Sequence, residues 1–408
     1  MSTPATAASA GAVIIATART ATGLTVGGSA SSFAPRVAFD ASPSITRSYF
    51  LGHHQAALSR MRQRLSNCGL IIEVRDFRIP LTSWNPMLER NLAATPEQRA
   101  RIIVYTKRDL GPSGGETRRK DQYPRQSSAE VIRALRNFHK EGRHARAVLF
   151  LGQDEFDKND GKLIDAIKSV AREIDSLTGL SAMVVGMPNA GKSTLLNRMR
   201  ARGMGLPKAA RTGASPGVTR KLGTPVRIAP GESHGVNGCE GLGEGVFVLD
   251  TPGVFIPYVS VAEDMLKLAL VGCVKDGLVP AVTVADYLLY HLNQVDHRLY
   301  TDRFCPRPTN DVHVFLRGIA QRTGKLLKGG ELSLESAAEW AIQQWRHGNL
   351  GRFLLDEVTP ETLGQSVEAA NSPTLSMNQA RKKDKAERKL KTQLKRMGIA
   401  PPATGGVV

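Results

Sequence analysis

The sequence predicts an α/β fold with a mainly parallel sheet, followed by a smaller all-helical domain. Up to Tyr258, short apolar runs of β-type alternate with segments of helical periodicity. This alternation is typical of βαβ units, which build parallel sheets. Beyond Tyr258 the β-type runs stop and only helical patterns follow. A glycine-rich turn at residues 186–194 separates a predicted strand from a predicted helix, which also fits an α/β domain.

The predicted elements of the α/β part follow one another closely. Each predicted strand is an apolar run closed by polar residues, and each predicted helix repeats apolar residues every three or four positions. Residues 111–125 and 202–245, which mix glycine, proline and charge, are predicted to be loops. The strands are expected at 70–74, 101–105, 147–151, 183–185 and 246–249, and the helices at 53–68, 131–140, 162–177 and 195–199.

The C-terminal part is predicted to be helical and ends in a basic tail. Helical periodicity marks residues 262–274, 284–292 and 334–345. Residues 379–396 contain nine lysines and arginines but two acidic residues, so they are expected to contact phosphates or to form a solvated tail. We therefore divide the chain into a leader (1–47), an α/β domain (48–257), a helical domain (258–357) and a basic disordered or helical tail (358–408).

The charge of the chain points to a polyanionic partner. Its 55 lysines and arginines outnumber 37 acidic residues, which gives a net charge of +18. Such a surface attracts nucleic acid or an anionic membrane at long range. The four cysteines lie far apart and form no CxxC pair, which excludes a zinc ribbon and a disulfide framework. No apolar run reaches the roughly 18 residues of a membrane span, so peripheral membrane contact is the most this sequence supports.

The first 47 residues differ in composition from the rest. They are rich in alanine, serine and threonine, they carry Arg19, Arg36 and Arg47, and no acidic residue precedes Asp40. This composition is typical of a mitochondrial transit peptide and not of a secretory signal. The alternative is a low-complexity N-terminus that carries no address.

The strongest motif is GMPNAGKST at residues 186–194, which satisfies the phosphate-loop pattern GxxxxGK[ST] between a strand and a helix. Its glycines allow backbone N–H groups to point at phosphate oxygens, and the helix N-terminus adds a favourable dipole. Lys192 is expected to reach the β- and γ-phosphates, and the Ser193 hydroxyl to bind Mg²⁺.

Two further motifs indicate GTP rather than ATP. Residues 250–253, DTPG, match DxxG, in which Asp250 holds the Mg²⁺ shell and the Gly253 N–H contacts the γ-phosphate. Residues 106–109, TKRD, match [NT]KxD, in which Asp109 accepts both the N1–H and the N2 amino group of guanine. Either motif alone is weak. With the phosphate loop, each at the end of an apolar strand, they predict a P-loop NTPase that binds GTP.

The order of the motifs is permuted. The base motif at residue 106 precedes the phosphate loop at 186 and DxxG at 250, whereas in most small GTPases the base motif comes after the other two. A parallel sheet tolerates this arrangement because surface termini often lie close together and can be rejoined. As a consequence the DxxG segment continues directly into the helical domain, which predicts that nucleotide state is transmitted there.

These motifs resemble the circularly permuted ribosome-assembly GTPases. The matching segments are GHHQAAL (52–58), IIEVRDFRIPLTSWNP (71–86), PGVTR (216–220) and the three nucleotide motifs. The chain is most similar to the branch of the bacterial 50S-assembly factor and mitochondrial GTPase 1. The resemblance implies Mg²⁺ as cofactor, potassium as a second ion, and GTP as substrate.

The resemblance also implies roles for individual residues. Thr219 matches the switch threonine that closes on Mg²⁺, and Val254 stands where most GTPases have a water-orienting glutamine. His53 matches a histidine implicated in catalysis, although the family has PGHM where this chain has LGHH at 51–54. Asn189 matches a phosphate-loop asparagine that binds potassium. The implied catalytic residues are His53, Thr219 and Lys192; the nucleotide-binding residues are Thr106, Lys107, Arg108, Asp109, Asn189, Ala190, Gly191, Lys192, Ser193, Thr194 and Gly253; and the Mg²⁺ ligands are Ser193, Thr219 and Asp250.

Two departures from the family pattern stand near the base motif. Residues 149–153, LFLGQ, occupy the position of an SA[KR]-like loop, whose contact with guanine is largely through backbone N–H. Thr106 replaces the usual asparagine. Both changes are compatible with GTP binding.

The function implied is a monomeric, slow GTPase switch that assists assembly of the mitochondrial large ribosomal subunit. It would contact that subunit and its rRNA in the matrix, or at the matrix face of the inner membrane. Three alternatives stay open at this point: a P-loop ATPase, an RNA-binding scaffold with structural nucleotide, and a cytosolic or nuclear pre-ribosomal GTPase of the same family.

Overall fold

The computed structural model divides into two compact units, residues 1–34 and 35–408, and the elements described below belong to the second. Of residues 52–58, 156–158 and 370 only the backbone is described. The structure describes residues 33–42, 45, 52–85, 99–112, 126–142, 145–153, 156–210, 213, 223–235, 237–254, 259, 261–371, 379, 382, 386, 389 and 393.

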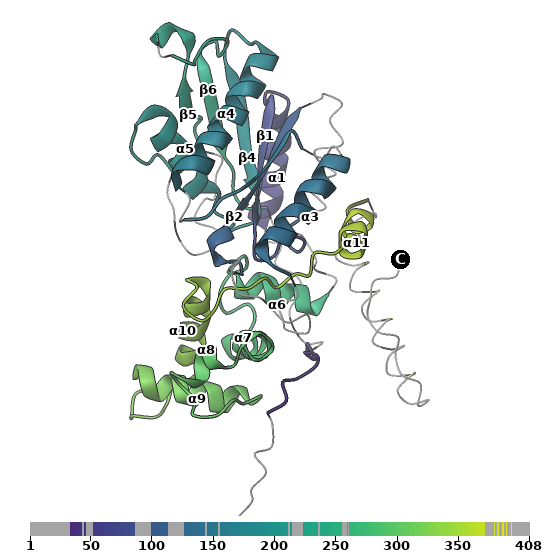
Figure 1. Ribbon diagram of the computed structural model, residues 1–408, viewed down its shortest axis with the longest axis vertical. Coiled ribbons are helices and arrows are strands. Elements are labelled where there is room, and N and C mark those ends of the chain that lie inside the picture. Colours follow the sequence, from purple (N-terminus) through teal and green to yellow (C-terminus); the bar gives the residue numbers. More distant parts are fainter. Residues whose placement is uncertain are drawn as a thin grey trace, which may run out of the picture. The chain divides into compact units, whose positions relative to one another are not determined.

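The α/β domain is built on a six-stranded sheet with the strand order β3-β2-β1-β4-β6-β5 (Figure 1). Neighbouring strands run parallel except β5, which pairs antiparallel with β6. This confirms the predicted α/β class and the mainly parallel sheet. The strands are β1 (Leu70–Asp76), β2 (Ala100–Thr106), β3 (Ala147–Phe150), β4 (Leu180–Gly186), β5 (Val226–Pro230) and β6 (Gly245–Asp250).

The register brings the polar ends of four strands to one edge of the sheet. Asp76 at the end of β1 pairs with Thr106 at the end of β2, and Val74 pairs with Gly186 of β4. Asp250, the last residue of β6, pairs with Val184 of β4. Ligands of open α/β sheets bind at the carboxyl ends of the strands. The three predicted nucleotide motifs therefore begin at the same edge.

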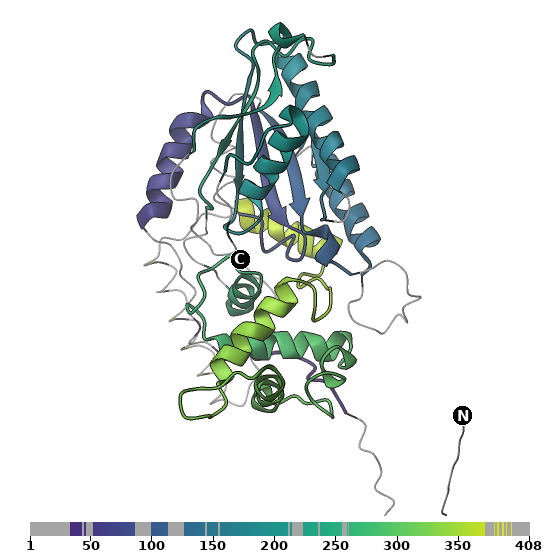
Figure 2. The same ribbon diagram turned by 90° about the vertical axis from the view of Figure 1, so that its left-hand side faces the viewer.

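Alternation along the strands sends side chains to two faces, and helices cover both (Figure 2). On one face, Val74 and Val184 pack with α4 (Phe156–Ile174) and α5 (Lys192–Met204). On the other face, Met183 and Val185 pack against Met61 and Leu65 of α1 (Gly52–Leu65). Further along this second face, Ile103 and Tyr105 pack against Val131 and Leu135 of α3 (Ser128–Glu141).

In the part of the chain that is described, every element from α6 onward is helical, as the sequence predicts. These helices share one large apolar core that includes Leu288, Phe315 and Trp345. The predicted helices at 284–292 and 334–345 correspond to α7 and α10, whereas α8 and α9 are additional. The helices are α6 (Ala262–Leu270), α7 (Ala281–Val295), α8 (Arg298–Thr301), α9 (Val312–Thr323) and α10 (Leu334–Arg346).

The chain then returns from the helical domain to the sheet. Leu354 and Val358 pack with Phe77 of the α/β domain, and α11 (Pro360–Asn371) adds Leu363 to the same cluster. Val358 and Leu363 are therefore part of the folded core, although the sequence places residues 358–408 in a tail. Of the basic segment 379–396, five positions lie within the described residues.

The folded unit also begins earlier than the predicted boundary at residue 48. The Arg36 guanidinium pairs with the Asp286 carboxylate of α7 at 2.7 Å. Phe39 packs edge-on against Tyr287 with ring centroids 5.1 Å apart, and Ile45 is buried in the helical core. Residues 36–42 and Ile45 therefore form an N-terminal strap on the helical domain, within the stretch predicted to be a disordered leader.

Candidate nucleotide-binding site

The phosphate loop has the backbone that its sequence requires. Gly186 has φ of 144°, and a side chain there would come within 2.2 Å of the Val74 carbonyl oxygen, so only glycine fits. Gly191 caps α5 in a left-handed conformation. Lys192 opens that helix and its Nζ donates to the Met187 carbonyl at 2.7 Å. The loop thus closes around its own lysine, with Thr194 in the first turn of α5, where free N–H groups favour an anion.

Lys192 is a buried cation at the start of α5. Desolvation lowers the pKa of its ammonium group to about 8, although the Asp250 carboxylate opposes this shift. A charge that has lost its water and has only partial compensation gains more from a triphosphate than a solvated one. Lys192 therefore stays the candidate phosphate ligand that the sequence predicts.

Ser193 and Asp250 form an oxygen pair that fits Mg²⁺. The Ser193 hydroxyl donates to Asp250 Oδ2 at 2.6 Å, although the two residues are far apart in the sequence. Asp250 Oδ1 is buried and has no hydrogen-bond partner among the described residues. Burial raises the pKa of Asp250, and the Ser193 hydroxyl and Lys192 oppose that rise. Mg²⁺ takes oxygen ligands, usually one or two carboxylates together with substrate phosphates, so this pair is a candidate Mg²⁺ site. When bound, the ion would neutralise charge on the phosphates.

The DxxG segment lies against the phosphate loop. A side chain at Gly253 would come within 2.5 Å of Pro188, so glycine is required there. The Val254 N–H donates to the Gly186 carbonyl at 3.1 Å, and the Thr251 hydroxyl donates to Val184 of β4 at 2.7 Å. The segment is thus attached to β4 and the loop by single hydrogen bonds.

Val254 cannot replace a water-orienting glutamine. Its apolar side chain is buried in the cluster that includes Met61 and Leu65 of α1. Any group that orients the attacking water must therefore come from elsewhere. His53 stands in the first turn of the same helix α1, and its side chain lies outside the described residues, as does Thr219.

The base motif is joined directly to the phosphate loop. The Thr106 hydroxyl donates to the Ala190 carbonyl at 2.6 Å and approaches the Arg75 carbonyl at 3.2 Å. Lys107 Nζ donates to the Asn189 carbonyl at 2.7 Å. The Thr106 hydroxyl thus links the base motif to the phosphate loop.

Asp109 lies beside the loop at residues 149–153, as the sequence places it. Its Oδ1 accepts the Gln153 N–H at 3.0 Å, and the Arg108 N–H donates to the Leu151 carbonyl at 3.0 Å. Gly152 lies so close that a side chain there would approach Asp109 at 3.2 Å. Backbone and carboxylate therefore form one surface suited to the edge of a guanine base.

Sequence reasoning missed three polar residues of segment 71–86. The Asp76 carboxylate accepts Lys107 Nζ at 2.8 Å and pairs with Arg78 at 2.8 Å. Burial opposes its ionisation, but Arg78 and Lys107 hold the pKa of Asp76 well below its usual value. Asn85 Nδ2 donates to the Val254 carbonyl at 3.0 Å. The sequence signal that could have pointed to them is that an apolar strand ends in the charged residues Arg75 and Asp76.

Asn189 is in contact with the helical domain. Its Nδ2 lies 3.4 Å from the Val271 carbonyl, just after α6. The phosphate loop thus contacts the helical domain directly, in addition to the DxxG connection that the sequence predicts.

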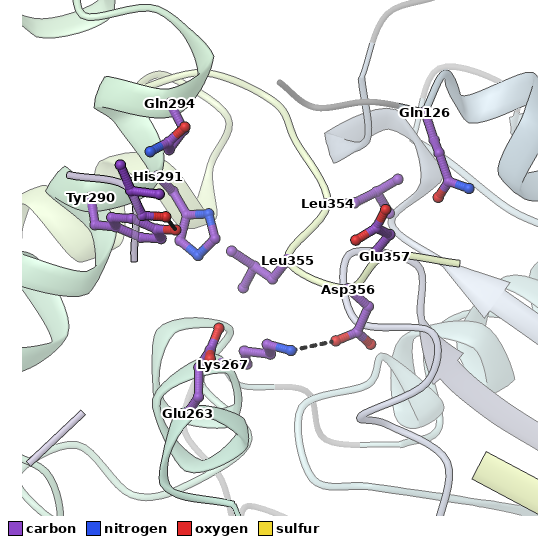
Figure 3. Close-up of a pocket in the computed structure, with 11 residues that line it drawn as sticks. Gln126, Glu263, Lys267, Tyr290, His291, Gln294, Leu354, Leu355, Asp356 and Glu357 are labelled. Carbon is purple, nitrogen blue, oxygen red and sulfur yellow. Dashed lines mark hydrogen bonds and ion pairs between the residues drawn. The ribbon is translucent and has the colours of Figure 1, made fainter. Parts of the chain in front are cut away.

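A pocket of about 330 Å³ shares no residue with this site. Lys267 and Asp356 form an ion pair at 3.2 Å there, and Figure 3 shows them reaching toward each other from α6 and the returning chain. Asp356 also accepts the N–H groups of Leu81 and Thr82 at 2.9 and 2.8 Å. The pocket therefore marks a junction of the two domains. Its lining residues are Val37, Gln126, Glu263, Lys267, Tyr290, His291, Gln294, Leu354, Leu355, Asp356 and Glu357.

The fold and the site define a GTPase of circularly permuted type, with the base motif on β2, the phosphate loop after β4 and DxxG after β6. Comparisons with known proteins agree. The family model described as 50S ribosome-binding GTPase matches residues 181–301. Mitochondrial GTPase 1 of Schizosaccharomyces pombe is 36% identical over 320 residues, which cover 77% of this chain and 91% of the relative. Mitochondrial ribosome-associated GTPase 1 of Xenopus tropicalis is 30% identical over 333 residues, which cover 79% of this chain and 98% of the relative.

The chain therefore belongs to the mitochondrial GTPase 1 family, and it is a GTPase. Among solved structures, GNP-bound YlqF from T. maritima is 18% identical, covers 74% of this chain and 98% of that chain, and gives a TM-score of 0.43. Within the described residues, none of the helices has the length and apolar character that a bilayer span requires.

Proposed function

We propose that this chain is a GTP-hydrolysing switch that assists assembly of the mitochondrial large ribosomal subunit and acts as a monomer in the matrix. The observation that carries the proposal is the Ser193–Asp250 pair, which joins the Mg²⁺ position to a segment leading into the helical domain. The net charge of +18 suits a partner made of rRNA. Relatives named as ribosome-associated support the choice of partner.

The switch follows from how the DxxG segment is connected. Residues 250–254 continue toward α6, so a shift of Gly253 with the γ-phosphate would pull on the helical domain. GTP would favour docking on the particle, and hydrolysis to GDP and phosphate would favour release. A second contact of the chain with the inner membrane would be peripheral.

The test of this function is co-sedimentation with mitochondrial ribosomal particles. The full chain should travel with the large subunit or its precursors in the presence of a non-hydrolysable GTP analogue, and should leave them with GDP. Co-sedimentation that is equal in both nucleotide states would refute the switch. Binding to cytosolic or nuclear particles instead would favour the alternative location.

We propose that catalysis depends on groups other than the buried Val254. Our candidates are His53, Thr219 and a potassium ion at Asn189. His53→Ala should keep its GTP affinity but lose most particle-stimulated hydrolysis, whereas Lys192→Ala should lose nucleotide binding. Turnover and affinity measured for both variants separate chemistry from binding. Unchanged stimulated turnover in His53→Ala would assign the missing group to the particle.

The strap refines the proposed import signal. Because Arg36, Phe39 and Ile45 are packed on the helical domain, removal of residues up to 47 would expose the α7 surface. We therefore expect processing before residue 35. N-terminal sequencing of the protein recovered from the matrix checks this boundary. A mature N-terminus at 46–48 would contradict it, and a protein that stays cytosolic would contradict the location itself.

A further inference from the structure

The C-terminal end of α10 carries two side chains that reach toward the nucleotide site. Trp345 is buried, and the Arg78 guanidinium lies over its ring at 4.9 Å from the centroid. The next residue, Arg346, donates to the carbonyls of Ala269 and Leu270 at 2.8 and 2.9 Å. One end of a single helix thus contacts both the sheet side and the end of α6.

A first route runs from Trp345 to the phosphate loop through buried charges. Arg78 donates to Asp76 Oδ1 at 3.0 Å and to Oδ2 at 2.8 Å. The same Oδ2 accepts Lys107 Nζ at 2.8 Å, and Lys107 Nζ also donates to the Asn189 carbonyl at 2.7 Å. Asp76 is fully buried, so its attraction for both cations is weakly screened.

A second route ends on the same asparagine. Arg346 donates hydrogen bonds to the last two carbonyls of α6. The next carbonyl, that of Val271, lies 3.4 Å from Asn189 Nδ2. Gly272 has φ of 82°, and a side chain there would approach Asn189 Nδ2 at 2.9 Å and Arg346 Cζ at 3.1 Å. The helical domain therefore contacts the Asn189 side chain here, and the first route ends on the Asn189 carbonyl.

The contact between Arg78 and Trp345 is the part of the first route that a substitution can remove without separating paired charges. Arg78 Nη1 and Trp345 Nε1 are buried without a hydrogen-bond acceptor in the described part of the chain. The aromatic ring is therefore what stabilises the outer edge of the guanidinium. The rest of the first route consists of paired charges, which are costly to separate.

We propose that Asp76 is a positioning residue that couples α10 to the phosphate loop, so that GTP affinity depends on the Arg78–Trp345 contact. With the ring in place, Arg78 fixes Asp76, Asp76 fixes Lys107, and Lys107 holds the Asn189 peptide in the conformation that binds phosphate. The inference goes beyond hydrolysis itself. It rests on the GTP-binding site and not on the identity of the ribosomal partner.

The experiment measures dissociation constants for GTP and GDP by fluorescent-nucleotide titration of the full chain without ribosomes. Trp345→Leu should weaken GTP binding about tenfold, which is about 1.4 kcal/mol. Trp345→Phe keeps an aromatic face and should stay within about threefold of wild type. Trp340→Leu is the matched control, because Trp340 lies in the same domain and packs on Phe304 with ring centroids 5.5 Å apart. The GTP affinity of this variant should equal that of wild type.

A double-mutant cycle tests the route itself. Asp76→Asn should weaken GTP binding on its own, and Trp345→Leu should add little in that background. If Asp76→Asn does not fold, Arg78→Lys replaces it, because lysine keeps the charge but not the planar contact with the ring. Wild-type affinity in folded Trp345→Leu, an equal loss in Trp340→Leu, or full additivity in the cycle would each overturn the proposal. A failure to bind ribosomes would leave it intact.

Discussion

The two sides of the phosphate loop are held by different interactions. On the base side, β1 and β2 are joined by buried ion pairs, in which Glu73 lies between Arg75 and Arg101 and Asp76 lies between Arg78 and Lys107. On the DxxG side, Asp250 accepts the Ser193 hydroxyl, and Thr251 and Val254 are attached by single neutral hydrogen bonds. The first side is therefore preassembled for recognition, and the second can move at low cost.

This difference matches the tasks of the two sides. The base is the same in GTP and GDP, so the surface that reads it gains from rigidity. The γ-phosphate is present in one state and absent in the other, so its sensor has to change position. Buried pairs cost 3–5 kcal/mol to break, whereas a neutral hydrogen bond contributes roughly 0.5–1.5 kcal/mol. The comparison makes predictions at three residues, taken in order of decreasing effect.

The largest effect is expected for Glu73→Gln. Loss of the carboxylate removes the charge partner of the buried Arg75 guanidinium and of the partly buried Arg101 guanidinium, so the free energy of unfolding should fall by about 3–5 kcal/mol. Glu173→Gln is the control, because its pair with Arg146 is about half exposed and should contribute less than about 1 kcal/mol. Chemical denaturation measures both. Equal effects of the two variants would show that the base side is not held by its ion pairs.

The same residue predicts a pH dependence. Burial alone would raise the pKa of Glu73, but Arg101 and Arg75 overcome this and hold it below its usual value. The unfolded chain then binds more protons than the native one, so this stability is present above about pH 4.3 and is lost as the pH falls below it. Between pH 4.5 and 3, the stability of Glu73→Gln should fall less steeply than that of the wild-type protein. The two slopes should differ by up to about 1.4 kcal/mol per pH unit.

A smaller loss, confined to binding, is expected for Asp109→Asn. An amide cannot accept both guanine donors, so GTP affinity should fall by about 2–4 kcal/mol. Xanthosine triphosphate should bind better than GTP, because the amide can donate to the xanthine carbonyl. Competition titrations with both nucleotides check the switch in preference. GTP affinity equal to wild type would mean that residues 106–109 do not read the base.

The fold class is predicted from sequence alone, and so is a candidate site, because the relevant signals are local. The phosphate loop, DxxG and TKRD each follow an apolar strand, and parallel strands bring their ends together. β5 was missed because it is five residues long, ends in Pro230 and pairs through an irregular register with β6. α11 and the strap were missed because their partners lie far away in the sequence. Asp76 has no motif of its own, and its role depends on Lys107 being beside it.

The smallest effect on stability, and the sharpest test of the DxxG side, is expected for Asn85→Ala. This removes the donor that holds the Val254 carbonyl at 3.0 Å and should cost about 1 kcal/mol of stability. GTP affinity should change less than twofold, because the hydrogen bond that is lost is made to the DxxG side. Hydrolysis should fall about three- to tenfold, because Gly253 and its neighbours are positioned less well.

Ser83→Ala is the matched control: its hydroxyl is buried with no partner among the described residues, so its removal should be nearly neutral. Single-turnover hydrolysis and nucleotide titration of both variants provide the comparison. If Asn85→Ala lost affinity and hydrolysis equally, the DxxG side would be part of the preassembled frame, and the proposed division between a rigid base side and a movable phosphate side would be wrong.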